Sequence, residues 1–494
     1  MELQEVTLDS LQAQMSSGAL TARQLTEAYL QRIETVDRAG PTLRSILETN
    51  PDALHIADAL DRERAAGQVR GPLHGIPVVL KDNIDTADRM HTTAGSLALL
   101  DAGVSADAPV ARKLREAGAI LLAKSNMSEW ANFRSTRSSS GWSGRGRQTR
   151  NPFVVDRSPG GSSSGSGVAV SANLCLAALG TETDGSIMSP SSGNGIVGIK
   201  PTVGLTSRQG VVPISHTQDT VGTHARTVSD AAAVLSAIAE SGTDYRQLLD
   251  PGALRGVRIG VARKFHTGYS EHTDGVFEHA LDVLRQCGAE VIDDVELPGE
   301  AALRDKFEDH DCSAERLVLE FELQADLAAY LATRTNTSLR TLADLIRFNE
   351  EHAADEMPYF RQELFDRSAA HGPLTDPLYR RALEHNAAFS RRFASLFEEQ
   401  SFAALVAPTN APSWAIDFVD GDRLLGGSAQ PAAVAGFPLV TVPAGFAFDR
   451  LPLGLTFMGP ALSEPTLINL AYAFEQAHPV RRAPCYMPTM LDLA

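Results

Sequence analysis

Two serine clusters on either side of one apolar segment constrain this chain more than any other feature. The stretch covers residues 158–200 and reads SPGGSSSGSGVAVSANLCLAALGTETDGSIMSPSSGNGIVGIK. Glycines leave the first cluster little side-chain bulk, so its backbone N–H groups can turn toward a ligand. Gly185 allows the same close approach beside Ser186. Attack on a carbonyl needs a nucleophile, a proton acceptor and N–H donors for the oxyanion, and this stretch offers all of them except the final base.

Composition and charge exclude several classes of function. The chain has 494 residues, 43% of them hydrophobic and 21% charged, which is enough for one large folded α/β domain. Its net charge of −17 argues against a nucleic-acid partner, since phosphate contacts need clustered Lys and Arg. Five arginines do lie within residues 134–150, and we interpret that Ser/Gly-rich segment as a solvated loop.

No sequence pattern indicates a metal or a cofactor. The 13 histidines form no HExxH motif, and the four cysteines have neither metal-site spacing nor a disulfide framework. We therefore predict a cofactor-free protein with reduced, mostly buried cysteines. The N-terminal MELQEVTLDSLQAQM lacks the order of an export signal, and no apolar run reaches the ~20 residues that span a bilayer. We expect a cytoplasmic monomer or homodimer without a membrane partner, or an exported one if a leader was removed before residue 1.

Hydrophobic periodicity predicts strands alternating with helices. Two helices are expected over residues 7–37 and another over 51–66. A buried strand over residues 76–80 would deliver Lys81 at its end, and a helix over 107–117 would lead to a parallel strand over 119–126. Later elements are helices over 229–239, 276–286 and 464–476, and strands over 256–262, 289–297, 403–408, 438–443 and 451–458.

Residues 300–400 are helical and charged, with few strand signals. Because strands resume after them, we predict a single domain over 1–494, with a helical insertion over 300–400 that forms part of the substrate cleft. The expected fold class is α/β, with a mixed central β-sheet surrounded by helices. The segment that holds the sequence motifs, residues 60–240, would be its core.

These motifs together resemble the amidase signature family. The pattern consists of KDN at Lys81, the cluster GGSSSGSG and the segment GTETDGSIMSP. Similarity extends through LHGIPVVLKDNID, AGAILLAKSNMSEWANF, GIVGIKPTVG, AGFPLVTVPAG and LPLGLTFMG, which is most of the chain. The resemblance implies the amidase signature fold and a serine-dependent hydrolysis of carboxamides that releases ammonia.

The resemblance also implies a role for individual residues. Ser186 matches the nucleophile, Ser162 the bridging serine behind a cis peptide bond, and Lys81 the terminal base. Ser163 would support this relay with a hydrogen bond. A base that works at neutral pH needs a pKa near 7, and burial at a strand end would lower the pKa of Lys81 toward it. The expected oxyanion hole is made of the backbone N–H groups of Thr183, Asp184, Gly185 and Ser186.

Three departures from the family pattern concern the substrate. Glu182, Asp184 and Met188 stand where the common pattern has Asp, Gly and Arg. In relatives that handle substrates such as glutamine, an arginine in this neighbourhood binds the acid group, so Met188 favours neutral and larger amides. The segments SEWANFR, GWS and RGRQTRNP resemble family members that remove the C-terminal amide of peptides. The predicted substrate contacts are Trp130, Asn132, Phe133, Trp142 and Met188.

Other interpretations remain open at this point. The chain could be a general aliphatic, aryl or fatty-acid amidase, the ammonia-generating subunit of a tRNA-dependent amidotransferase, or a binding protein with an anion cradle. Residues 161–165 also fit G-x-S-x-G, which would make Ser163 the nucleophile of an α/β-hydrolase, although Pro159 and a short apolar run precede it. Lys124 is a second strand-end lysine, which we interpret as structural.

Overall fold

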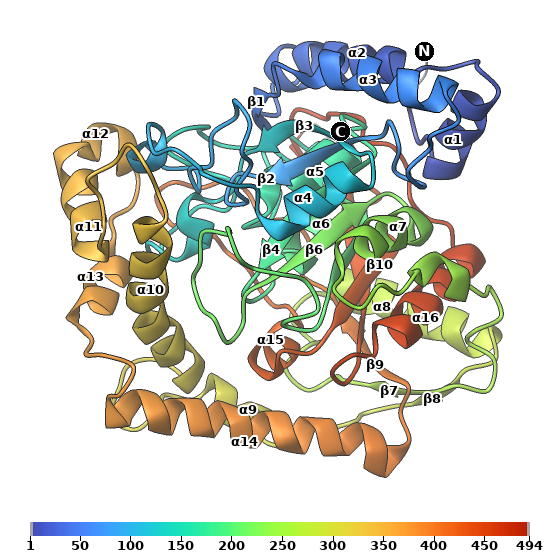
Figure 1. Cartoon of the computed structure of the whole chain (residues 1–494). Coiled ribbons are helices and arrows are strands. Elements are labelled where there is room, and N and C mark those ends of the chain that lie inside the picture. Colours follow the sequence, from blue (N-terminus) through green and yellow to red (C-terminus); the bar gives the residue numbers. More distant parts are fainter. Residues whose placement is uncertain (1–2, 492–494) are drawn as a thin grey trace.

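An 11-stranded mixed β-sheet flanked by helices forms the centre of the molecule (Figure 1). The computed structural model describes residues 3–491. Neighbouring strands follow the order β1-β3-β2-β4-β6-β5-β10-β11-β9-β7-β8. Parallel pairs join β2 to β3 and β4, and β7 to β8 and β9, while the other neighbours are antiparallel. The predicted fold class is confirmed, including the parallel pairing of the strands that end near Lys81 and Lys124.

The first 240 residues build the β1 to β6 half of the sheet. Its strands are β1 (Ile46–Thr49), β2 (Pro77–Lys81), β3 (Ile120–Ser125), β4 (Ala177–Glu182), β5 (Val197–Lys200) and β6 (Thr220–Ala225). Its α-helices are α1 (Leu8–Ser16), α2 (Ala22–Arg32), α3 (Ala53–Ala65), α4 (Pro109–Glu116), α5 (Ser164–Ser171), α6 (Met188–Gly193) and α7 (Val228–Ile238). A π-helical turn over Ile33–Arg38 extends α2. The apolar segment between the serine clusters therefore divides into the end of α5 and the buried strand β4.

The remaining strands complete the sheet from distant parts of the chain. They are β7 (Arg258–Val261), β8 (Glu290–Ile292), β9 (Ala404–Pro408), β10 (Leu439–Ala447) and β11 (Leu451–Met458). The helices α8 (Glu271–Gln286), α15 (Gln430–Ala435) and α16 (Glu464–Ala477) accompany them. The strand predicted over 289–297 is limited to three residues, because it lies at the sheet edge and Asp294 turns left-handed at φ 54°. β10 instead continues past Pro443, where the register shifts by a bulge.

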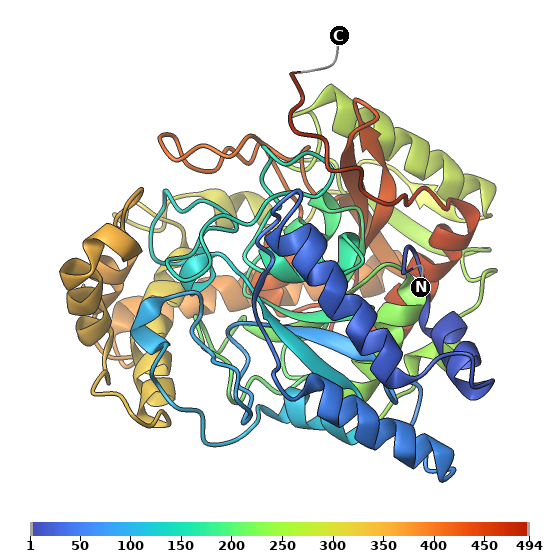
Figure 2. The ribbon, with the colours of Figure 1, turned by 90° about the horizontal axis from the view of Figure 1, so that it is seen from above.

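The helical insertion lies to one side of the sheet (Figures 1 and 2). It contains α9 (Glu300–Arg304), α10 (Ala314–Ala332), α11 (Leu342–Glu351), α12 (Ala353–Glu356), α13 (Glu363–Ala370) and α14 (Pro377–Gln400). α10 packs against α13 and α14, and α14 also contacts α15. Within the described residues, no helix combines the length and apolar character needed to cross a membrane.

β2 brings Lys81 into the interior. All five of its residues are buried, because the strand lies between β3 and β4. Parallel strands with neighbours on both sides are nearly continuous apolar runs, as Pro77–Leu80 is here. A lysine at the end of such a strand meets little water, which sets the chemistry of the site.

Candidate active site

A cavity of about 780 Å³ opens beside the turn that follows β4. Gly161 and the four residues Thr183, Asp184, Gly185 and Ser186 line it from the two serine motifs. The insertion contributes part of the wall, with Arg304, Ser313, Glu315, Arg316, Leu319 and Leu364. The segments that carry the sequence motifs and the helical insertion thus meet around one space.

Lys81 and Ser162 are in direct contact next to this cavity. Lys81 Nζ lies 2.8 Å from Ser162 Oγ, 2.8 Å from Thr181 Oγ1 and 3.2 Å from the Thr181 carbonyl oxygen. Both side chains are fully buried. The Gly161–Ser162 peptide bond is cis. Asn83 Nδ2 donates to the same Thr181 hydroxyl at 3.0 Å, which fixes the side chain that holds the amine.

Burial lowers the pKa of Lys81 to about 7. The cause is the loss of water around the charged ammonium form. The negative charges of Asp219 and Glu182 oppose this shift without cancelling it. Lys81 is thus a base with a pKa near neutrality.

Ser186 lies at the cavity wall, in the turn between β4 and α6. The turn reverses at Gly185, whose φ of +75° is left-handed. Glu182 secures its far side by accepting hydrogen bonds from the N–H groups of Ile187 and Met188. Among the residues that the structure describes, the N–H groups of Thr183, Asp184, Gly185 and Ser186 have no acceptor. All four residues line the cavity, so the structure leaves these donors available for the predicted oxyanion hole.

Ser163 faces away from this space. Its side chain is fully buried and donates to the Thr181 carbonyl at 3.0 Å, while the Thr181 N–H donates back to its Oγ at 3.2 Å. Ser163 precedes α5, and no strand runs directly into this turn. The geometry therefore differs from the exposed elbow serine of an α/β-hydrolase.

Lys124 occupies the end of the neighbouring strand β3 in a different setting. Its ammonium donates to Thr92 Oγ1 at 2.8 Å and also to the Ile84 carbonyl. Burial lowers the pKa of Lys124, while Asp82 and Asp85 act in the opposite direction. No serine of the two motifs is among its hydrogen-bond partners in the described part of the chain.

The predicted substrate contacts separate into two groups. Asn132 and Phe133 line the cavity. Trp130 packs edge-on against Phe365, with ring centroids 5.7 Å apart. Residues 130–132 all have a left-handed backbone, and the side chain of Trp130 therefore takes a different direction from those of Asn132 and Phe133.

Trp142 and Met188 are placed elsewhere. Trp142 packs edge-on against Phe360 and lines a separate pocket of about 440 Å³. Met188 begins α6 and is buried in an apolar cluster with Phe389 and Leu439, so its side chain supports the turn from behind. Proximity to the motif in sequence does not decide which side of the turn a residue faces.

The arginine-rich segment is also more ordered than we predicted. The interpretation of residues 134–150 as a solvated loop is wrong for Arg134 and Arg145. Arg134 is fully buried, and its Nε lies 2.8 Å from Glu129 Oε1. Arg145 pairs with Glu48 at 2.7 Å and with Asp82 at 3.1 Å. These cations neutralise buried carboxylates.

Polar residues from outside the motifs connect the turn to the insertion. Thr183 Oγ1 donates to Asp219 Oδ1 at 2.6 Å. Gln218 Nε2 donates to the Thr183 carbonyl at 3.2 Å and to Glu315 Oε1 at 3.0 Å. Sequence reasoning missed Asp219, Gln218 and Glu315, since they lie 30 to 130 residues beyond the motif and carry no pattern of their own.

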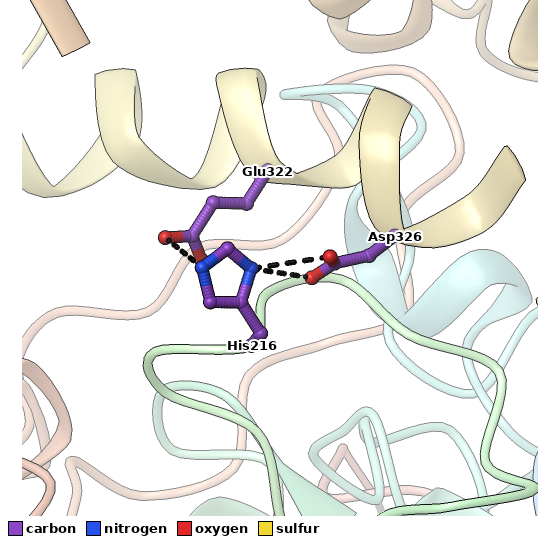
Figure 3. Close-up of side chains that lie close together, drawn as sticks. All are labelled: His216, Glu322 and Asp326. Atoms are coloured by element: carbon purple, nitrogen blue, oxygen red, sulfur yellow. Dashed lines mark hydrogen bonds and ion pairs between the residues drawn. The ribbon is translucent and has the colours of Figure 1, made fainter. Parts of the chain in front are cut away.

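His216 joins the same loop to helix α10, as Figure 3 shows. Its Nδ1 lies 3.0 Å from Asp326 and its Nε2 lies 3.3 Å from Glu322. The two carboxylates lie at opposite edges of the ring, so each ring nitrogen already has an acidic partner. Hydrogen bonding to Asp326 raises the pKa of His216, and Glu322 adds to the effect. The group is therefore an ion-paired link between loop and helix.

Comparisons with known proteins identify the family of this chain. The family model described as Amidase matches residues 24–468. A probable amidase of Arabidopsis thaliana is 39% identical, covering 98% of this chain and 92% of its own. The structure of native peptide amidase from Stenotrophomonas maltophilia has a TM-score of 0.91 and 48% identity, covering 98% of this chain and 99% of its own. A glutamyl-tRNA(Gln) amidotransferase subunit from Moorella thermoacetica is 34% identical over 97% of both chains. Both the family model and these relatives span nearly the whole sequence, and the chain therefore belongs to the amidase signature family, whose members are amide-hydrolysing enzymes.

Proposed function

We propose that this enzyme hydrolyses the C-terminal amide of peptides through a Ser186–Ser162–Lys81 relay. The observation that carries the proposal is the contact of 2.8 Å between the buried Lys81 amine and Ser162 Oγ, next to the cavity that Ser186 lines. The similarity to a peptide amidase over nearly the whole chain supports the substrate class.

The hydrogen bonds around Lys81 fit a neutral base. A neutral amine has two N–H donors and one lone pair. The carbonyl and hydroxyl oxygens of Thr181 can accept both donors, which leaves the lone pair for the hydroxyl of Ser162. Ser162 can then pass its proton to Lys81 while it takes the proton of Ser186.

Acylation follows from this transfer. Ser186 Oγ forms a bond to the amide carbon, and negative charge develops on the carbonyl oxygen. The N–H groups of Thr183, Asp184, Gly185 and Ser186 would stabilise that charge, at about 3–4 kcal/mol for one such donor. The C–N bond then breaks, and the departing nitrogen takes the proton from Lys81 through Ser162 and leaves as ammonia. Water then attacks the carbonyl carbon of the acyl-enzyme and gives a proton to Lys81 through Ser162. The bond between that carbon and Ser186 Oγ breaks, Ser186 takes the proton back through Ser162, and the carboxylic acid leaves.

The test is ammonia release by the purified chain from three substrates. These are N-acetyl-phenylalaninamide, glutamine and a long-chain fatty amide. We expect the peptide amide to have the highest kcat/KM, and Ser186→Ala to lower its kcat by at least about 10⁴-fold. Preference for glutamine would favour the amidotransferase interpretation, and preference for the fatty amide would favour a general amidase. A Ser186→Ala enzyme with the wild-type kcat would contradict the assignment of the nucleophile.

A further inference from the structure

Asp184 is a carboxyl group in the oxyanion turn, two residues before Ser186. Its side chain is exposed to the cavity, although the turn lies deep inside the protein. Among the residues that the structure describes, nothing hydrogen-bonds to it. Every other acidic group that lines this cavity is held by protein donors: Gln218 and Gln430 donate to Glu315, and Trp414 donates to Asp422.

The position of Asp184 limits its charge during the reaction. A carboxylate beside the oxyanion hole would oppose the negative charge that develops there. Burial raises the pKa of Asp184, and the negative charges of Glu315 and Glu182 raise it further. The positive charges of Arg304 and Lys200 act in the opposite direction. Of the pair Asp184 and Glu315, only Glu315 accepts stabilising N–H donors. Both differences favour the neutral form of Asp184.

A neutral carboxyl offers one O–H donor and one C=O acceptor. A peptide group offers the complementary C=O acceptor and N–H donor, whereas a simple carboxamide has no such group on its acyl side. A bound substrate displaces the water around Asp184, and a polar group that then finds no partner is costly. Such a site therefore discriminates against substrates that leave the carboxyl unpaired.

Resting on the function proposed above, we propose that the Asp184 carboxyl, which lines the cavity without a protein partner among the described residues, binds the peptide group on the acyl side of the scissile amide and so selects peptide amides over simple carboxamides. The apolar side chains of Phe133, Leu319, Leu424 and Leu425 line the same cavity and can receive the substrate's side chain. Leu424 and Leu425 are 49% and 65% exposed, so contact with a substrate would cover them. Asp184 is thus a specificity-determining residue.

The experiment compares two substrates that differ only in the peptide group. They are N-acetyl-phenylalaninamide and 3-phenylpropanamide, which lacks the acetamido substituent. Asp184→Leu keeps the backbone N–H of the oxyanion turn, and we expect it to lower kcat/KM about 10- to 100-fold more for the first substrate than for the second. Asp184→Asn keeps a donor and an acceptor, so the ratio of its two kcat/KM values should stay within about 3-fold of the wild-type ratio. Asp309→Asn and Asp309→Leu are matched controls at an exposed position of the insertion and should change neither value.

The ratio of the two kcat/KM values within one variant does not depend on how much of the protein is folded. A ratio in Asp184→Leu that equals the wild-type ratio would overturn the proposal. A ratio in Asp184→Asn that falls as far as in Asp184→Leu would also overturn it, because binding would then need the charged carboxylate. A wild-type enzyme that hydrolyses 3-phenylpropanamide but no peptide amide would refute the proposed function itself. A wild-type enzyme that hydrolyses the peptide amide through Ser186, without a contribution from Asp184, would refute only this inference.

Discussion

Two buried lysines at the ends of adjacent parallel strands have different surroundings. Lys81 Nζ contacts the hydroxyl groups of Ser162 and Thr181 and the Thr181 carbonyl. The charges of Asp219 and Glu182 oppose the lowering of its pKa. Lys124 is fixed by the Ile84 carbonyl and Thr92 beside Asp82 and Asp85. Hydrogen-bond partners, rather than burial, distinguish the two lysines, and only those of Lys81 fit the proposed proton relay.

At this scale we predict an acid limb in the pH profile. Lys81 must be neutral to accept a proton, and its pKa is about 7, so kcat/KM should fall about tenfold per pH unit below pH 7. Lys81→Met should lose at least about 10³-fold in kcat at pH 8. The measurement is the pH dependence of kcat/KM for a peptide amide between pH 5 and 9.

Lys124→Met is the matched control, because it removes another buried strand-end lysine. It should lower stability and leave the midpoint of the acid limb in place. A wild-type profile that is flat from pH 5 to 8 would contradict the assignment of Lys81 as the base.

At the scale of elements, the loop between β5 and β6 links the oxyanion turn to the insertion. Asp219 and Gln218 contact Thr183 on one side, and His216 contacts α10 on the other. Ser215 and Thr217 add hydrogen bonds to Glu322. The turn is therefore held partly by a helix more than 100 residues later in the chain.

His216 should make this link dependent on pH. Its pKa is raised in the folded state, so its contribution to stability is complete below the unfolded pKa of about 6.5 and is lost as pH rises through the folded value. His216→Ala should lower the free energy of unfolding by about 1 kcal/mol at pH 5.5, since the ring is partly solvated, and by less at pH 9. Thermal unfolding at both pH values measures the difference.

His55→Ala removes an exposed histidine from α3 and should show no such difference between the two pH values. A stability deficit of His216→Ala that grows as pH rises would refute the ion-paired link.

At the scale of the whole molecule, one buried ion pair ties the insertion to the sheet. Arg334 follows α10, and its Nη1 lies 2.8 Å from Asp85 Oδ1, just beyond β2. Its Nη2 donates to the carbonyls of Thr92 and Ala102, and Tyr330 donates its hydroxyl to the same carboxylate. The Arg334 side chain is 1% exposed, so the segment after α10 is anchored inside the core.

Loss of this arginine should destabilise the protein strongly. Arg334→Ala leaves Asp85 buried without its cation, which costs about 3–5 kcal/mol of unfolding free energy. Arg347→Ala, which breaks an exposed pair with Asp344, should cost less than about 0.5 kcal/mol. Denaturant unfolding compares the two, and a cost below about 1 kcal/mol for Arg334→Ala would contradict the anchoring role.

The sequence predicted correctly those strands and helices that have a clear local pattern of apolar or capping residues. Apolar runs of strand length and capped amphipathic segments predicted β2, β3, β9, β11 and most of the helices, because period and capping act within one element. β1, β4, β5 and β6 were missed, and β8 was predicted too long, since these strands depend on pairing with neighbours that are distant in the sequence. The serine clusters and the KDN segment identified the family because their residue types and spacing are directly visible in the chain.

Tertiary packing decided what these patterns do not contain. Only the folded chain determines that Met188 and Trp142 pack away from the cavity while Asn132 and Phe133 line it. It also brings Glu315 beside Asp184 and leaves Asp184 without a partner among the described residues. The sequence by itself therefore determined the chemical groups and the sheet they belong to. Their pKa values, orientation and selectivity arise from burial and contacts between distant segments, which no local pattern records.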